Sequence, residues 1–202
     1  MYTISKETWN TKTMVKVSVL GVISFILMFF DFPLPWLAPT FMKIDISDLP
    51  SLIGAFAIGP MAGVIVQFLK NLLNVLIEGT TTAGVGELAN FVVGAIFAFT
   101  AGIVYHRKKT FNRAVIGLIL GTIAMTIVIT LANYFVMFPL YAKLMGLEMQ
   151  VFIDMGKAIN KNITDLRSLM LLSVVPFNLL KGILETAITL LIYKRVSPIL
   201  KK

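Results

Sequence analysis

The sequence LMLLSVVPFNLLKGILETAITLLIY fills residues 169–193. An α-helix needs about 20 mostly apolar residues to cross the hydrocarbon core of a bilayer, so this stretch predicts a transmembrane helix. Its centre nevertheless carries the amide of Asn178 and the ammonium group of Lys181. An ionisable side chain near the middle of a bilayer costs roughly 2.5–3.5 kcal/mol, so we expect it to have a function or a partner.

Asn178 and Lys181 are three residues apart, so a helix places them on one face. A polar pair in apolar surroundings is typical of a pocket for a mostly apolar ligand. Two structural alternatives stay open. Asn178 could form a hydrogen bond between two helices, and Lys181 could pair with Glu185, which lies one helical turn further along.

Composition indicates that the whole chain is a membrane protein. Its 202 residues are 57% hydrophobic and only 14% charged, whereas a soluble domain carries about 25% charged residues. The chain has no cysteine, which excludes disulfides, thiol nucleophiles and cysteine metal sites. Its single histidine, His106, stands beside Arg107 at the end of an apolar stretch and is interpreted as an interfacial residue.

The apolar stretches predict an all-α integral membrane protein in which residues 1–202 form one bundle of six transmembrane helices. The first is interpreted as a retained helix, because no small-x-small cleavage site follows it. The second is short, with a cap at Ser47 or Asp48. The fifth breaks near Pro139. The predicted helices cover approximately residues 14–30, 48–59, 61–77, 86–105, 114–140 and 169–193.

The distribution of charge orients this bundle. If both termini are cytoplasmic, the inner segments hold eleven basic residues and one acid: Lys6, Glu7, Lys12, Lys16, Arg107, Lys108, Lys109, Arg113, Lys194, Arg195, Lys201 and Lys202. The outer segments, chiefly the loop 31–47 and the polar segment 141–167, then hold five basic and eight acidic residues. Basic residues are retained on the cytoplasmic side, so we predict that both termini are cytoplasmic. The net charge of +8 lies beside the membrane helices and not on a soluble face, which argues against a nucleic-acid partner.

The predicted orientation brings polar side chains together near the outer surface. Asn133 lies roughly 9 Å before the outer end of its helix, and Asn178 and Lys181 lie roughly 15 Å below the outer end of theirs. The loop 31–47 lies on the same side and could cover a cavity there, and Glu87 and Asn90 enter from the fourth helix. The predicted substrate-binding residues are Met42, Lys43, Asp45, Glu87, Asn133, Phe177, Asn178 and Lys181.

Three further features each allow more than one interpretation. Lys70 lies within the third helix and could extend to the interface, pair with an acid or touch a ligand. The small-residue pairs at positions 94 and 98 and at 117 and 121 are interpreted as sites of close helix packing. Ser18, Gly21 and Ser24 form a stripe on the first helix that could pack internally or contact another membrane subunit.

Catalytic patterns are missing from the sequence. It contains no Ser/His/Asp set, no His-Glu-x-x-His and no Walker A lysine loop. The weak dinucleotide-like match beginning at Gly84 lacks the strand that such a motif requires. We therefore predict no catalytic residue and no metal site, and we expect that this chain alone cannot hydrolyse ATP.

Two segments together carry a family resemblance. Residues 41–63 read FMKIDISDLPSLIGAFAIGPMAG and lead into Lys70-Asn71, and residues 176–182 read PFNLLKG. Both resemble the substrate-binding S components of energy-coupling factor (ECF) vitamin transporters, and most closely the riboflavin-specific branch. The likeness runs from the first helix to the last and includes FDFPLP at residues 30–35.

The resemblance implies a six-helix protein of the bacterial cell membrane that captures riboflavin from outside with high affinity. It implies a transmembrane coupling subunit and two cytoplasmic ATPases as partners, which hydrolyse ATP, while riboflavin is a transported ligand and not a cofactor. Asn133, Asn178 and Lys181 would hydrogen-bond the flavin or its ribityl chain, and the loop around Lys43 and Asp45 would close over it. Ser18, Gly21 and Ser24 would stand in the groove that contacts the coupling subunit.

The residue chemistry agrees with such a ligand. Riboflavin is neutral and has a flat ring edged by carbonyl oxygens and an N–H group, which suits amides and a single ammonium group. Phe177 is one of several aromatic side chains that could sandwich the ring. Two alternatives remain: an S component for a different small vitamin, or a membrane enzyme or assembly protein of another class.

Overall fold

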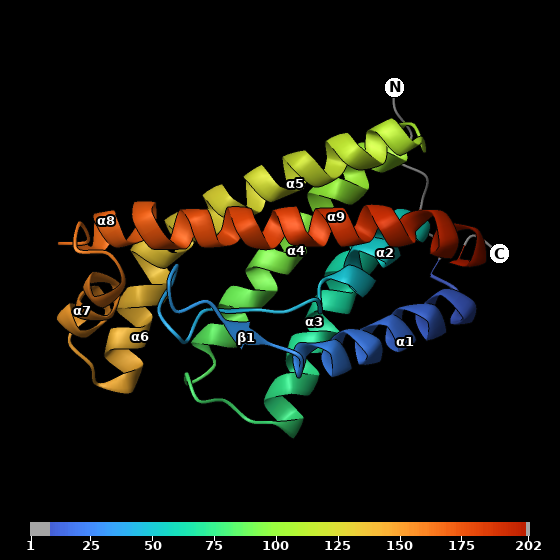
Figure 1. Ribbon diagram of the computed structural model, residues 1–202. Helices are drawn as coiled ribbons and strands as arrows, with labels where there is room; N and C mark the ends of the chain where they lie inside the picture. Colours follow the sequence, from blue (N-terminus) through green and yellow to red (C-terminus); the bar gives the residue numbers. More distant parts are fainter. Residues whose placement is uncertain (1–8, 201–202) are drawn as a thin grey trace.

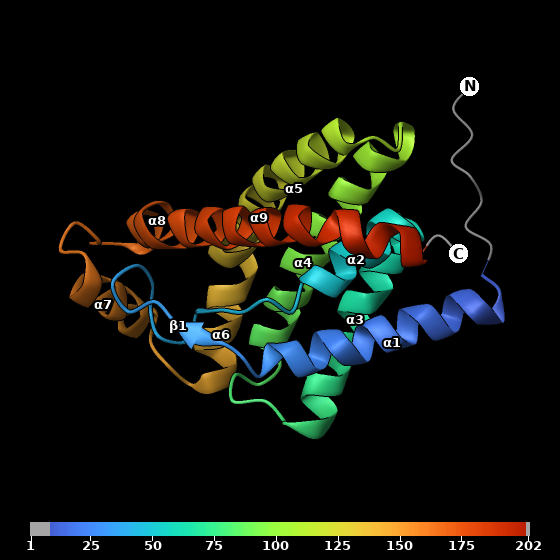
Figure 2. The same ribbon diagram turned by 45° about the vertical axis from the view of Figure 1, so that its right-hand side comes forward.

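A computed structural model describes the backbone of residues 9–200 and the side chains of residues 9–193. Helices dominate the fold, and the two ends of the described chain lie on the same side of it (Figures 1 and 2). The long helices are α1 (Thr11–Met28), α3 (Pro60–Ile77), α4 (Val85–Arg107), α5 (Phe111–Ala132) and α9 (Val175–Leu200). The shorter ones are α2 (Leu49–Ala57), α6 (Phe138–Met145), α7 (Met149–Ile159) and α8 (Leu166–Leu169).

Five helical stretches among the described residues are long and apolar enough to cross a membrane, and α2 adds the predicted short element between α1 and α3. This confirms a helical membrane protein with several spans. Helix α2 has only nine residues, yet it lies inside the bundle, because Leu52, Ala55 and Phe56 are all buried. As predicted, it ends where Gly59 and Pro60 begin the next helix.

The fifth and sixth spans each contain a turn of π-helix. In the fifth span, η1 (Asn133–Met137) joins α5 to α6, and in the sixth, η2 (Met170–Val174) joins α8 to α9. Each turn ends two residues before a proline, Pro139 or Pro176. A proline has no N–H group for the carbonyl four residues earlier, and its ring also crowds that carbonyl, so the helix widens locally.

The predicted break near Pro139 is therefore wrong, because the fifth span continues to Met145. The widened turn accommodates the proline without ending the helix, with the Phe138 N–H donating to the Asn133 carbonyl. Part of the predicted polar segment 141–167 is consequently helical, and it also contains the amphipathic helix α7 that such a segment allows.

Small residues allow the helices to pack closely. A Cβ atom at Gly117 would lie 2.7 Å from the Ala101 carbonyl oxygen, and one at Gly121 would lie 2.6 Å from the Phe97 ring. These contacts confirm the predicted packing role of both glycines, which join α5 to α4. Gly94 is covered by the Gln67 side chain of α3 in the same manner.

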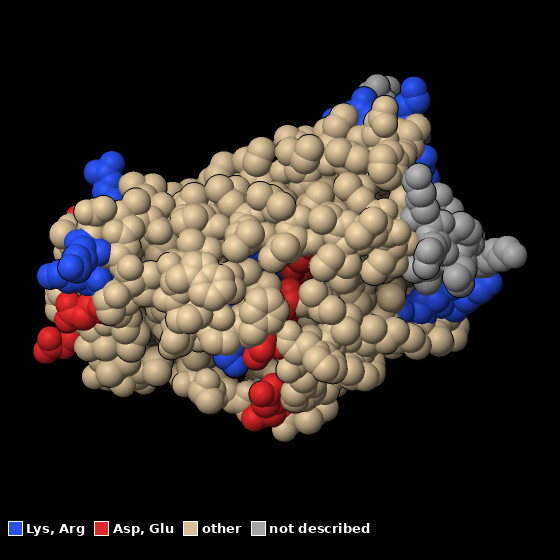
Figure 3. All heavy atoms as spheres, in the orientation of Figure 1, with Lys and Arg blue, Asp and Glu red and all other residues tan. Residues whose placement is uncertain are grey.

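Charged side chains lie mainly at the two ends of the molecule. On the face shown in Figure 3, only basic atoms appear at the end near the chain termini, whereas both signs appear at the opposite end. The broad area between them is uncharged, as expected for a surface in contact with lipid, apart from a group of acidic and basic atoms at its centre and lower edge. The side chains of Lys6, Glu7, Lys194, Arg195, Lys201 and Lys202, which entered the charge count, lie outside the described residues.

Before α2, the loop 31–47, which was expected on the outer side, contains a minimal hairpin. Strand β1 (Phe32–Pro33) pairs antiparallel with β2 (Lys43–Ile44), each strand having two residues. Lys43 also pairs with Asp31, with 2.9 Å between its Nζ and the nearer carboxylate oxygen. Buried packing holds the loop beside α6 and α9 (Figures 1 and 2): Leu34, Ala38 and Ile44 form one buried cluster with Phe177, and Phe41 packs with Phe138 and Tyr141.

Candidate functional site

A cavity of about 120 Å³ opens between the loop 31–47 and three of the spans. Its walls come from the loop, α4, the fifth span and α9. It is lined by Phe41, Met42, Lys43, Gly86, Ala89, Asn90, Val93, Ile129, Asn133, Phe138, Tyr141, Phe177, Asn178 and Lys181. Six of the eight predicted substrate-binding residues are thus brought together at one cavity.

Three amide side chains line this cavity. Asn133 is the first residue of the π-helical turn η1, and Asn178 follows η2 by four residues. The Asn178 Nδ2 donates to the Val174 carbonyl at 2.8 Å, so the amide is held at one side while its own oxygen stays available as an acceptor. Among the described residues, the buried Oδ1 of Asn90 has no hydrogen-bond partner, which leaves an acceptor for a ligand.

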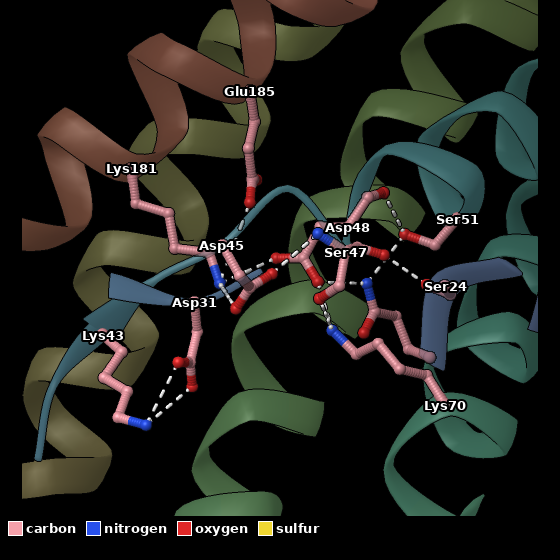
Figure 4. Close-up of polar contacts among 11 residues, drawn as sticks. Ser24, Asp31, Lys43, Asp45, Ser47, Asp48, Ser51, Lys70, Lys181 and Glu185 are labelled. Atoms are coloured by element: carbon pink, nitrogen blue, oxygen red, sulfur yellow. Dashed lines mark hydrogen bonds and ion pairs between the residues drawn. The ribbon is translucent and has the colours of Figure 1, made fainter. Parts of the chain in front are cut away.

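Lys181 lies at the wall of the cavity within a group of buried carboxylates. Its Nζ is 3.1 Å from an oxygen of Asp48, 3.6 Å from one of Asp45 and 3.8 Å from one of Glu185. Figure 4 shows Lys181 and Glu185 extending from α9 toward the two aspartates that precede α2. The predicted pairing of Lys181 with Glu185 is present, but it is the longest of the three contacts.

The cap of α2 was expected at Ser47 or Asp48; Asp48 occupies the N-cap position, but its side chain makes no capping hydrogen bond. Its Oδ1 instead lies 2.5 Å from the Lys70 Nζ and 2.7 Å from the Gln67 Nε2. Lys70 also donates to the Ser47 hydroxyl at 2.9 Å. Of the three interpretations of Lys70, pairing with an acid is the one that the structure shows.

Five charged groups therefore share one buried cluster: Asp45, Asp48, Lys70, Lys181 and Glu185, all at most 4% exposed. Single acceptor oxygens of the three acids lie within 4.8 Å of one another, a spacing at which carboxylates can bind a cation. Here the Lys181 ammonium lies within 3.8 Å of all three acids and takes the place of such a cation. The ion pairs of this cluster join α3 and α9 to the segment in which Asp45 and Asp48 precede α2.

Aromatic side chains surround the loop end of the cavity. The Phe41 ring lies 6.1 Å from the ring centres of Phe138, Tyr141 and Phe152, at angles that give edge-to-face or tilted contacts. Phe41, Phe138 and Tyr141 line the cavity, but the sequence did not identify them as site residues. Phe41 belongs to the motif that carries the family resemblance, so its position was the available signal.

Two of the predicted binding residues, Asp45 and Glu87, do not line the cavity. Asp45 is beside it, where its carboxylate pairs with Lys181 and accepts from the Ser47 N–H at 2.7 Å. The Glu87 carboxylate accepts hydrogen bonds from the hydroxyls of Thr80 and Thr82, each at 3.0 Å. Asp45 can therefore act through Lys181, whereas Glu87 holds the α3–α4 turn.

Internal packing accounts for most of the small-residue stripe on α1. A Cβ at Gly21 would lie 2.9 Å from the Leu69 side chain of α3. Ser24 is buried and donates its hydroxyl to the Ser47 carbonyl. Only Ser18 of the three is exposed, so Gly21 and Ser24 do not offer the surface that was expected for a partner subunit.

Comparison with known proteins places this fold and cavity in a family. The sequence model described as the substrate-specific component of the ECF transporter matches residues 12–193. The riboflavin transporter RibU of Staphylococcus aureus is 38% identical over 96% of this chain and 94% of its own length. The riboflavin transporter FmnP of Bacillus subtilis is 33% identical, with 94% of each chain covered.

A solved structure described as the S component of a bacterial ECF transporter is also similar. It covers 95% of this chain and 98% of its own, with 38% identity and a TM-score of 0.72. The match extends over all the segments that line the cavity, and the family consists of transporter components and not of enzymes. The chain belongs to the family of ECF transporter substrate-specific components, which are multi-pass membrane proteins.

Proposed function

We propose that this protein captures riboflavin from the outer side of a bacterial membrane for import. The observation that carries the proposal is the convergence of Asn133, Asn178 and Lys181, from two different spans, at one cavity lined with aromatic rings. Relatives that match nearly the whole chain are riboflavin transporters. The same cavity supports the choice of ligand on chemical grounds.

Riboflavin offers groups that match this lining. Its flat ring can stack on aromatic side chains such as Phe41, Phe138 or Phe177, which border the cavity. Its carbonyl oxygens can accept from Lys181 and from the amide of Asn133, and its N–H group and hydroxyls can donate to amide oxygens. Because the ligand is neutral, the ammonium groups of Lys43 and Lys181 at the cavity are sufficient, and an arginine cluster of the kind that binds phosphate is not needed.

The size of the cavity indicates that the outer loop moves when the ligand enters. Its volume of about 120 Å³ is below the roughly 300–1,000 Å³ that is typical of small-molecule sites. The loop is held chiefly by Leu34, Ala38 and Ile44, which are buried in one cluster with Phe177. The exposed ion pair of Lys43 with Asp31 adds little, since such pairs contribute only about 0–1 kcal/mol. A ligand larger than this volume can enter only if the loop gives way. We therefore expect the loop 31–47 to be displaced and then to close over riboflavin.

Import also requires partners. We propose a transmembrane coupling subunit and two cytoplasmic ATPases, supported by the family and by the lack of an ATP-binding motif in this sequence. The side of α1 that points away from the bundle is available to the coupling subunit; it carries the exposed residues Val15, Ser18, Val19 and Val22. The buried Gly21 and Ser24 lie on the other side of α1, where they contact Leu69 and the Ser47 carbonyl and fix the helix to the bundle.

Riboflavin titration of the detergent-purified protein tests the proposal. Wild-type protein should quench riboflavin fluorescence, or carry flavin absorbance from the cells. Asn178→Ala and Lys181→Met should each weaken binding by about 1–3 kcal/mol, because each removes a hydrogen-bonding group from the cavity. The matched controls Asn162→Ala and Lys161→Met change exposed residues of the same types and should bind normally.

Two results would contradict this assignment. A wild-type protein that ignores riboflavin but binds another vitamin would change the substrate. Normal riboflavin affinity in both Asn178→Ala and Lys181→Met would place the site away from the cavity.

A further inference from the structure

The ammonium group of Lys181 is paired with three buried carboxylates and also faces the cavity. An ammonium has three N–H donors, and three carboxylates lie within 3.8 Å of this one. Lys181 also lines the cavity. Among the described residues, neither Asp48 Oδ2 nor the Glu185 oxygens have a hydrogen-bond partner, and Asp45 lies beyond hydrogen-bonding distance at 3.6 Å. The carboxylates therefore hold the ammonium by charge, and its N–H donors can serve a substrate.

Asp48 is the carboxylate best suited to hold the Lys181 ammonium in place. It is closest to Lys181, at 3.1 Å. Its other oxygen is fixed by Lys70 at 2.5 Å and by Gln67 at 2.7 Å, and the residue is completely buried. Two donors from a rigid helix therefore hold Asp48 in position, as Figure 4 shows for Lys70.

The other two acids are held less firmly. Asp45 lies 3.6 Å from Lys181 and belongs to the segment between β2 and α2, the end of the outer loop. Glu185 lies 3.8 Å away, and within the described part of the chain neither of its oxygens has a hydrogen-bond partner. A substrate acceptor can replace either contact without disturbing the pair of Asp48 with Lys70.

Lys70 and Gln67 are absent from the cavity lining. They lie on α3, three residues apart and hence on one face of that helix. Any effect of these residues on substrate binding must therefore pass through Asp48 to Lys181. This separation distinguishes a positioning role from direct contact with the ligand.

We propose that Asp48, fixed by Lys70 and Gln67, is a positioning residue that holds the Lys181 ammonium at the cavity wall for the substrate. The proposal rests on the proposed function, because it concerns how riboflavin meets Lys181. It assigns to α3, which does not line the cavity, a part in substrate affinity. It also explains why the third span carries a fully buried lysine.

Riboflavin titration of purified full-length variants tests this role. Asp48→Asn should weaken binding about tenfold or more, because the Lys181 ammonium loses the nearest carboxylate that holds it at the cavity wall. In a Lys181→Met background the same substitution should change affinity less than about twofold, because residues that act through one partner are not additive. Asp154→Asn, an exposed acid on α7, is the matched control and should bind normally.

A second variant separates positioning from stability. Asp48→Asn leaves Lys70 buried without its carboxylate, so it could prevent folding. The double variant Asp48→Asn/Lys70→Met removes both charges and should regain thermal stability, yet it should still bind riboflavin about tenfold more weakly.

Each result bears on the proposal. Wild-type affinity in the double variant would overturn it, as would an equal effect of Asp48→Asn with and without Lys181. If wild-type protein failed to bind riboflavin, the proposed function would fall and the inference with it. If wild-type protein bound riboflavin and Asp48→Asn bound equally well, the inference alone would fall.

Discussion

A lysine is tolerated inside this bundle because Lys181 and Lys70 are surrounded by acids from other segments. The cluster contains three carboxylates and two ammonium groups, so its charges nearly balance. Removing one partner of a buried pair leaves an uncompensated charge and typically costs about 3–5 kcal/mol. The cluster therefore ties α2 and α3 to α9 at the same depth as the cavity wall.

Asn90 provides a residue-scale prediction that separates binding from stability. Its buried Oδ1 has no partner among the described residues, and the side chain lines the cavity. Replacing such a group by an apolar one can be neutral or stabilising. Asn90→Leu should therefore unfold at the same or a higher temperature, while riboflavin binding weakens by about 1–2 kcal/mol. A lower unfolding temperature with normal affinity would show that Asn90 is structural.

At the scale of the helices, the two π-helical turns determine which side chains reach the cavity. A π turn contains one more residue per hydrogen-bonded loop than an α turn, so it rotates the residues that follow relative to those before it. Asn133 begins η1, and Asn178 follows η2 in the other span. Both cavity amides thus depend on a widened turn next to a proline.

Restoring a regular helix should therefore weaken binding. Pro139→Ala supplies the missing N–H and removes the ring, so we expect the fifth span to regain α-helical hydrogen bonds and Asn133 to rotate away. Riboflavin affinity should fall by about 1 kcal/mol or more, measured by titration. Pro60→Ala is the control, since Pro60 lies in the first turn of α3, where no helical hydrogen bond is missing. Equal affinity in both variants would remove the role of the π turn.

The start of the last span gives a pH-dependent prediction. Hydrogen bonds from the Ser168 N–H and hydroxyl hold the pKa of Asp165 below its ordinary value of 3.8, and the two residues form a capping box. A lowered pKa means that the cap contributes above the ordinary value and is lost as pH falls through the lowered one. The protection of amides 166–169, measured as the exchange rate relative to that of an unfolded chain at the same pH, should therefore persist at pH 3.8 and fall at lower pH.

Asp165→Asn is the matched variant, because asparagine can also cap a helix but does not titrate. Its exchange pattern should not change over the same range. A loss of protection in the wild-type protein that begins well above pH 3.8 as the pH is lowered would contradict the lowered pKa.

At the scale of the whole molecule, the absence of cysteine makes the predicted orientation easy to test. Lys109 lies between α4 and α5, and Lys161 lies between α7 and α8; both are exposed. In intact cells, an impermeant maleimide should label Lys161→Cys but label Lys109→Cys only after lysis, because basic residues are retained inside. The reverse pattern would invert the orientation and place the cavity on the cytoplasmic side.

The positions of the spans follow from the sequence alone, because length and hydropathy are local properties that each segment carries by itself. The stretch that contains Asn178 and Lys181 could be recognised as a membrane helix with a polar centre without knowing its neighbours. The same holds for the close packing at Gly117 and Gly121, since a small residue is needed wherever two helix backbones approach.

Only the tertiary structure decided how the helices are rotated and which side chains meet. Asp48 had the sequence position of a cap but pairs with Lys70 and Lys181, which are 22 and 133 residues further along the chain. Gly21 and Ser24 face inward, and Tyr141 reaches the cavity because the helix continues through Pro139. These outcomes depend on long-range packing and on the balance of buried charge, and neither is written in the hydropathy of a single segment.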